Sequence, residues 1–173
     1  MAKIYIVLMH SMTAPAKLVK FATRYKYSHV AIALEKECNT LYSFGRKKPN
    51  NPFDGGYSVE NRDGGFFKKF PNAVCRVYEW EVSDTQKEAL EKILFDMKKT
   101  QSIYKYDFLG AFLRFFKIPV QFKNLYTCTS FVAWALEKTG IYSFDIPTMF
   151  VIPKHFENIK NLNQIYEGKY LDM

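Results

Sequence analysis

Apolar, β-branched segments fill much of the first half of this chain, and they restrict its fold more than any other feature. Branched and aromatic side chains pack well on a pleated surface, so such segments favour β-strands over helices. We predict four strands, at residues 3–9, 27–34, 41–44 and 73–82. Cys38-Asn39-Thr40 has turn composition, so the second and third strands are expected to form a hairpin.

Helical patterns follow these strands. Ser83 and Gln86 have the spacing of a capping box, and apolar residues then recur at helical intervals as far as Met97. Residues 129–139 are the clearest helix, which Gly140 ends in the usual C′ position. Because the chain has no internal repeat, low-complexity tract or linker, we assign residues 1–173 to one α+β domain.

The remaining segments are assigned from composition. Residues 16–25 are expected to form a short helix, and residues 141–173 to wrap loosely. Residues 45–65 are rich in Gly, Pro, Asn and Asp, which predicts a long loop over a functional site. Residues 106–116 form a strongly aromatic helix. We favour a buried core helix there, since apolar residues occupy nearly every side; the alternative is a surface for an anionic membrane.

Composition limits the class of protein. The chain is 48% hydrophobic and 17% aromatic, which is too apolar for a disordered protein. Its net charge of +8 favours anionic partners, but the basic residues are dispersed, as on an ordinary basic surface. No nucleic-acid-binding motif occurs, so no nucleic-acid partner is expected. Neither a signal peptide nor an apolar stretch of membrane-spanning length is present, which predicts a cytoplasmic protein.

Three cysteines occur, an odd number without CxxC spacing, which argues against a disulfide framework or a zinc site. No cofactor or metal is expected. Cys38 falls in a turn and Cys75 inside a strand, and we interpret both as structural. Cys128 opens a helix, where free N–H groups and the helix dipole favour a thiolate and can bind an oxyanion. The alternative is a small, buried, apolar side chain.

A nucleophilic thiol needs a base, and the histidines are His10, His29 and His155. His29 lies within a predicted core strand. His10 ends the first strand and can lie near the same edge, whereas His155 is expected to be peripheral. Alone, a histidine in this position is more often structural, but together with Cys128, His29 fits Cys–His catalysis.

The segments SHVAIAL, LYSFGRK and YTCTSFVAWAL, in this order, resemble the circularly permuted NlpC-type papain-like proteins. That group includes YiiX-like bacterial proteins, and lecithin retinol acyltransferase shares the order. The resemblance covers residues 3–155. It implies an antiparallel sheet packed against helices, one of which bears the cysteine.

By this resemblance, Cys128 is the nucleophile and His29 its base. The orienting group is expected on the strand after the histidine, where Ser43 shares a face with Leu41. Serine cannot compensate the charge of an imidazolium, so Glu60 from the loop, or His10, is an auxiliary candidate. Tyr126, two residues before the cysteine, can donate to the oxyanion or simply pack.

The resulting hypothesis is a thiol hydrolase or amidase that cleaves an amide or ester through a cysteine acyl-enzyme. Its partner would be a small peptide, amide or lipid substrate. Two alternatives stay open: a lipid acyltransferase or thioesterase at anionic membranes, and a non-catalytic binding module on the same fold. The substrate and the oligomeric state are not predicted.

Overall fold

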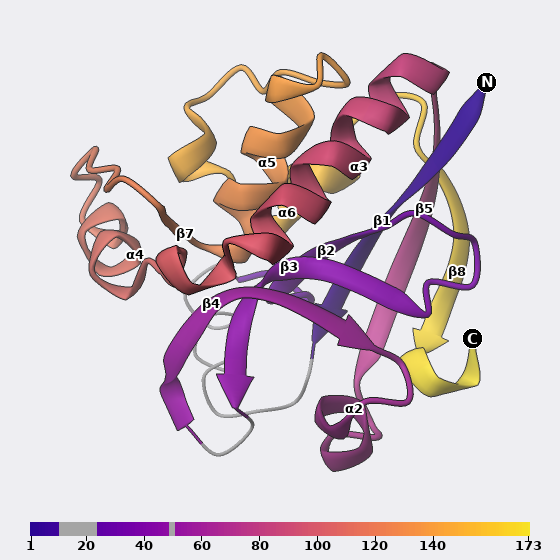
Figure 1. Cartoon of the computed structure of the whole chain (residues 1–173), viewed down its shortest axis with the longest axis horizontal. Helices are drawn as coiled ribbons and strands as arrows, with labels where there is room; N and C mark the ends of the chain where they lie inside the picture. Colours follow the sequence, from indigo (N-terminus) through magenta and orange to yellow (C-terminus); the bar gives the residue numbers. More distant parts are fainter. Residues whose placement is uncertain (11–23, 49–50) are drawn as a thin grey trace.

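The computed structural model describes residues 1–10, 24–48 and 51–173 and has an α+β fold (Figure 1). The strands are β1 (Ala2–His10), β2 (His29–Ala33), β3 (Thr40–Lys48), β4 (Asn51–Asn61), β5 (Val74–Val82), β6 (Lys105–Tyr106), β7 (Leu125–Tyr126) and β8 (Asn163–Lys169). The helices are α2 (Gly65–Lys69), α3 (Asp84–Lys99), α4 (Phe108–Phe115), α5 (Cys128–Lys138) and α6 (Pro153–Glu157), with short 3-10 turns at Gln101–Ile103, Thr148–Phe150 and Tyr170–Asp172.

The strands form one sheet in the order β7-β6-β4-β3-β2-β1-β5-β8. Neighbouring strands are antiparallel except β6 and β7, which pair in parallel. The first three strands of the sequence, β1, β2 and β3, lie in the middle of the sheet, and later strands are added at both edges. Residues near 105 and 125 are therefore brought beside the N-terminal strands.

Side chains alternate between two buried layers, as a pleated sheet requires. On β1, Ile4, Ile6 and Leu8 face the layer that contains α3 and α5, which we call the helix face. Tyr5 and Val7 face the other layer, the opposite face, which contains Phe67 of α2 and Tyr170. This parity assigns every later strand residue to one of the two faces.

The strands predicted in the first 82 residues and the capping box of α3 are confirmed: the Ser83 side chain accepts from the N–H of Gln86. The predicted loop at 45–65 is wrong, because β3 runs on to Lys48 and β4 covers Asn51–Asn61. A Cβ on Gly55 would lie 2.7 Å from the Cβ of Tyr106. Glycine is thus required there by close packing against β6 rather than by a turn.

The predictions for three further segments have different outcomes. The predicted helix at residues 16–25 falls mostly on residues outside the described part of the chain. The C-terminal segment does not merely wrap loosely, since β8 adds an edge strand beside β5. The helix predicted at 106–116 exists as α4, but the favoured interpretation of a buried core helix is wrong: Leu109 and Phe112 are exposed. Nowhere in the described residues is a helix both long and apolar enough to cross a bilayer.

Candidate functional site

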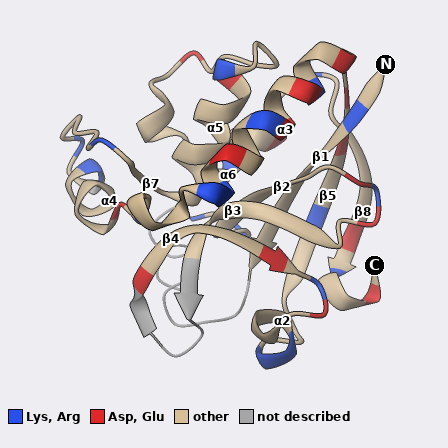
Figure 2. Cartoon of the chain, viewed as in Figure 1, with Lys and Arg blue, Asp and Glu red and all other residues tan. Residues whose placement is uncertain are grey.

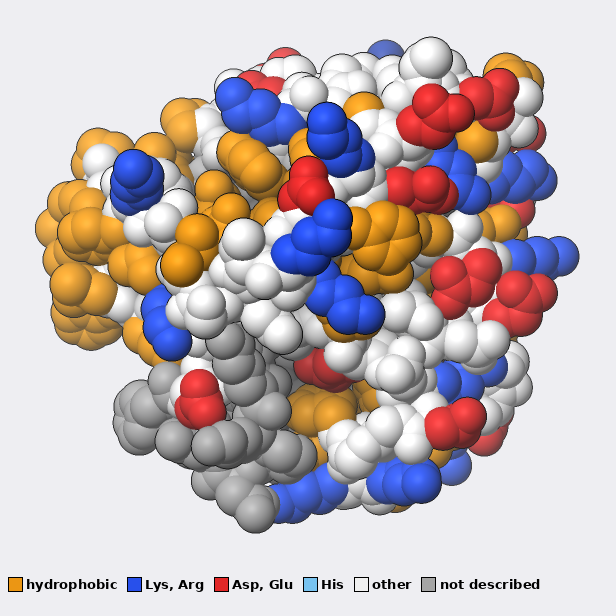
Figure 3. Space-filling view, in the orientation of Figure 1, with side chains coloured by type: hydrophobic (Ala, Val, Ile, Leu, Met, Phe, Trp, Pro, Cys, Tyr) orange, Lys and Arg blue, Asp and Glu red, His pale blue; other side chains and the backbone are white. Residues whose placement is uncertain are grey.

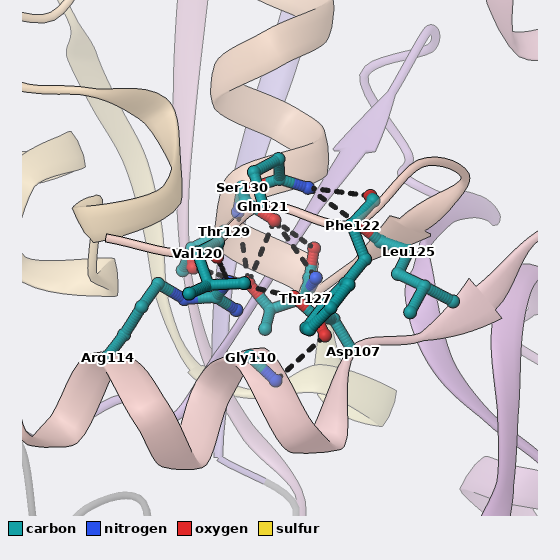
Figure 4. A network of polar contacts seen from close by, with 10 residues as sticks. All are labelled: Asp107, Gly110, Arg114, Val120, Gln121, Phe122, Leu125, Thr127, Thr129 and Ser130. Atoms are coloured by element: carbon teal, nitrogen blue, oxygen red, sulfur yellow. Dashed lines mark hydrogen bonds and ion pairs between the residues drawn. The ribbon is translucent and has the colours of Figure 1, made fainter. Parts of the chain in front are cut away.

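Helix α5 begins with a capping arrangement that leaves two backbone donors available. The Thr127 hydroxyl accepts from the N–H of Ser130 at 3.2 Å, and the Ser130 hydroxyl accepts from the N–H of Thr127 at 2.9 Å. Figure 4 shows these residues beside the start of α4. The N–H groups of Cys128 and Thr129, which the cap does not use, lower the pKa of the Cys128 thiol.

Two further donors reach this sulfur from outside α5. One is the hydroxyl of Tyr106, on β6, and the other is the backbone N–H of Val30, on β2. That N–H belongs to the peptide bond between His29 and Val30. Cys128 therefore lies against the peptide that joins His29 to Val30, but the His29 side chain projects to the opposite face of the sheet, so the sulfur and the imidazole lie on different faces.

The sulfur occupies a position where β2 and β3 are not paired in the usual way. Their ladder has one register pair, Ile32 with Tyr42. The Val30 N–H lowers the pKa of the Cys128 thiol, and the Val30 carbonyl accepts from the Ser43 hydroxyl at 2.6 Å. The Ser43 hydroxyl therefore donates its hydrogen bond to the backbone of β2, the strand that carries His29. This bond helps to position that strand.

Burial raises the pKa of the Cys128 thiol, although the four donors around the sulfur lower it. Burial therefore acts against the thiolate that the helix start was expected to favour. Desolvation of a residue that is 5% exposed outweighs the helix N-terminus. A thiol of raised pKa needs a base to remove its proton before it attacks a carbonyl.

His29 and Glu60 converge over a glycine on the strand between them. A Cβ built on Gly45 would lie 3.7 Å from Cε1 of His29, 3.6 Å from Oε1 of Glu60 and 3.5 Å from the hydroxyl of Ser58. His29 pairs with Met9, so its side chain is on the opposite face. The absent side chain at Gly45 thus lets a carboxylate approach the imidazole, and Glu60 comes from β4 rather than from a loop.

Tyr126 and Tyr106 divide the roles that the sequence suggested for one tyrosine. The parallel pairing of β6 with β7 sets these residues side by side. The Tyr126 ring packs against Phe44 and Trp134, with centroids 5.2 and 5.5 Å apart. Tyr106 is the tyrosine that contacts the sulfur. Sequence reasoning missed it, because nothing in the sequence pairs residue 106 with residue 126.

The other histidines and cysteines occupy structural positions. His10 is 2% exposed, and its Nδ1 lies 3.0 Å from the hydroxyl of Ser28, the residue before His29. His155 accepts from the N–H of Ile152 and caps α6. Burial raises the pKa of Cys38 and of Cys75 to about 12, on the opposite face.

A buried ion pair separates α4 from the start of α5 (Figure 4). Asp107 accepts from the N–H of Gly110 at 2.9 Å and from Nη1 of Arg114 at 2.8 Å. Arg114 also donates to the carbonyl of Val120, at 2.9 Å. Asp107 follows Tyr106 directly, so this pair anchors the segment that presents the Tyr106 hydroxyl to the sulfur.

Within the described residues, no group of three or more His, Cys, Asp or Glu side chains is arranged to hold a metal ion. No protein-family model and no curated protein sequence matches this chain.

Proposed function

We propose that the protein is a cysteine hydrolase that cleaves an amide or ester through an acyl-enzyme on Cys128, on a permuted papain-like fold. The observation that carries this proposal is the position of the sulfur: it is at the first turn of a helix, among four hydrogen-bond donors, against the peptide that leads to His29. A thiol, an imidazole and preorganised N–H groups are the parts that acyl transfer needs.

In the proposed reaction, His29 turns its side chain from the opposite face toward the sulfur and removes the thiol proton as the sulfur attacks the carbonyl carbon. The carbonyl oxygen then becomes an oxyanion, which the N–H groups at the α5 start and the Tyr106 hydroxyl can bind. The imidazolium returns its proton to the leaving amine or alcohol, and water releases the acyl group by the reverse steps. Glu60 stabilises the imidazolium, a role for which its carboxylate is suited and the Ser43 hydroxyl is not.

The raised pKa of Cys128 favours a second candidate, a binding module that keeps this arrangement without turnover. The two candidates differ in whether the sulfur ever forms a covalent bond with an acyl group. A covalent readout therefore separates them without knowledge of the natural substrate.

The test is acylation by an activated ester, followed by intact-protein mass spectrometry. We expect wild type and the matched control Cys75→Ala to gain an acyl group, and Cys128→Ala to gain none. Because a general base contributes about 100-fold or more, His29→Ala should acylate at least that much more slowly. Equal acylation of wild type and Cys128→Ala would refute the hydrolase, and a folded wild type that is never acylated would establish the binding module.

A further inference from the structure

Helix α4 has its charged side chains buried against the protein and its apolar side chains exposed. The side that packs against the protein carries the Asp107–Arg114 ion pair, whose side chains are 0% and 6% exposed. The outward side carries large apolar residues: Leu109 is 59% exposed, Phe112 61% and Phe116 59%. A helix that faces water has the reverse arrangement, with its apolar side inward and its charges outward.

The exposed apolar residues form one surface. Phe108, Phe112 and Phe116 follow each other at intervals of four, so they share one side of the helix. The rings of Phe112 and Phe116 touch, with centroids 5.3 Å apart, and the exposed Ile118 follows them. Figure 3 shows apolar side chains gathered over this end of the molecule. Single exposed apolar residues are ordinary, whereas a contiguous group marks a contact surface.

The chain segment that carries this surface is basic. From Met97 to Leu136 the sequence has six basic residues and one acidic residue, Asp107, which is buried against Arg114. Three of the basic residues, Lys105, Lys117 and Lys123, are exposed near the ends of the α4 segment. Figure 2 shows basic residues around α4, with acidic colour at the start of this helix and, below it, on β4.

We propose that the outward side of α4 docks the protein on an anionic lipid bilayer. Aromatic side chains enter the boundary between headgroups and acyl chains, while lysines around them meet lipid phosphates. This occupant satisfies both observations, because a bilayer offers an apolar layer beneath a layer of negative charge. Docking does not rest on the proposed hydrolase activity, since it uses none of the residues assigned to the thiol chemistry.

Flotation with lipid vesicles tests the proposal, using phosphatidylcholine alone and phosphatidylcholine mixed with phosphatidylglycerol. Wild type and Cys128→Ala should float with the anionic vesicles and not with the neutral ones. Phe112→Ser should weaken the partition coefficient about tenfold, whereas Leu171→Ser, an exposed apolar residue at the other end of the molecule, should not. Lys117→Glu should weaken it about fivefold or more, in contrast to the control Lys68→Glu on α2.

Two results would overturn this inference. One is flotation that Phe112→Ser and Lys117→Glu leave at the wild-type level. The other is a dimer in light scattering that Phe112→Ser dissociates, because a second copy of the chain would then cover the same surface. Phe112 and Lys117 are exposed, so their replacements should leave thermal unfolding unchanged, and that measurement excludes misfolding as the cause of lost binding.

Discussion

The contact between the Tyr106 hydroxyl and the Cys128 sulfur makes a quantitative prediction that needs no substrate. In Tyr106→Phe the sulfur loses one of its four donors, so the pKa of Cys128 should rise further above its ordinary value. A hydrogen bond to a charged acceptor contributes about 1.5 kcal/mol. Loss of that amount corresponds to about a tenfold smaller thiolate fraction at a given pH below the pKa.

The reactivity of the remaining thiolate partly offsets this loss. A thiolate of higher pKa is the better nucleophile, and with a Brønsted coefficient of about 0.5 a tenfold change in thiolate fraction leaves about a threefold change in rate. We therefore expect Cys128 in Tyr106→Phe to react with iodoacetamide about three times more slowly than in wild type.

Mass spectrometry of digests taken during alkylation near neutral pH would measure this rate at Cys128 separately. The reaction of Cys38 and Cys75 should be negligible, because burial raises the pKa of each to about 12. Tyr126→Phe is the matched control: it removes a hydroxyl from the adjacent strand and should leave the rate unchanged. A rate in Tyr106→Phe equal to or above that of wild type would refute the assigned role of this hydroxyl.

Two further predictions concern stability, measured by urea unfolding. In Gly110→Ala a Cβ would lie 2.1 Å from Oδ2 of Asp107 and 2.6 Å from Nη1 of Arg114, so the buried pair must separate, at a cost of about 3 kcal/mol in the free energy of unfolding. The control Gly65→Ala, with open space around its Cβ, should change little. Equal losses in both variants would contradict the reasoning. Glu167 accepts from Lys26 first, and also from Tyr27 and Arg76, which together lower its pKa to about 2. A carboxylate whose pKa is lower in the folded than in the unfolded protein stabilises the fold at any pH above its unfolded-state pKa. That stabilisation is lost as the pH falls through its folded-state pKa. Because its side chain is 30% exposed, Glu167→Gln should lose about 1 kcal/mol at neutral pH and nothing near pH 2; a loss that persists at pH 2 would point to another cause.

Local patterns predicted much of this fold, because capping and β-propensity act over a few residues. The Ser83 cap and the helix after Thr127 follow from such signals. Packing between distant segments overrode them elsewhere. Gly55 lies in a segment of turn composition, yet it belongs to β4. Its glycine is explained by β6, which packs too closely there for a side chain. The outward Phe112 could not be predicted either, since the sequence does not say which side of an aromatic helix meets the protein.

The candidate site was predictable in its chemistry but not in its geometry. Cys128 and His29 were distinguishable by residue type and position, whereas their neighbours depend on strand order. Tyr106 reaches the sulfur through a parallel pair of very short strands, which carry almost no propensity signal. Glu60 approaches His29 only because β3 between them has a glycine at position 45. The raised pKa of Cys128 depends on burial, which the helix-start argument did not weigh.

The pairing of β6 with β7 also means that the segment between these two strands can vary. Lys105 pairs with Leu125 and Tyr106 with Tyr126, so the chain leaves the sheet and returns to it at adjacent points. Each doubling of the length of a flexible loop between such points costs only about 0.6 kcal/mol. Parts of residues 107–124 can therefore be exchanged for segments of other length and character, provided that the buried Asp107–Arg114 pair, which anchors Tyr106, is kept. Re-targeting the protein to another surface would then leave its thiol in place.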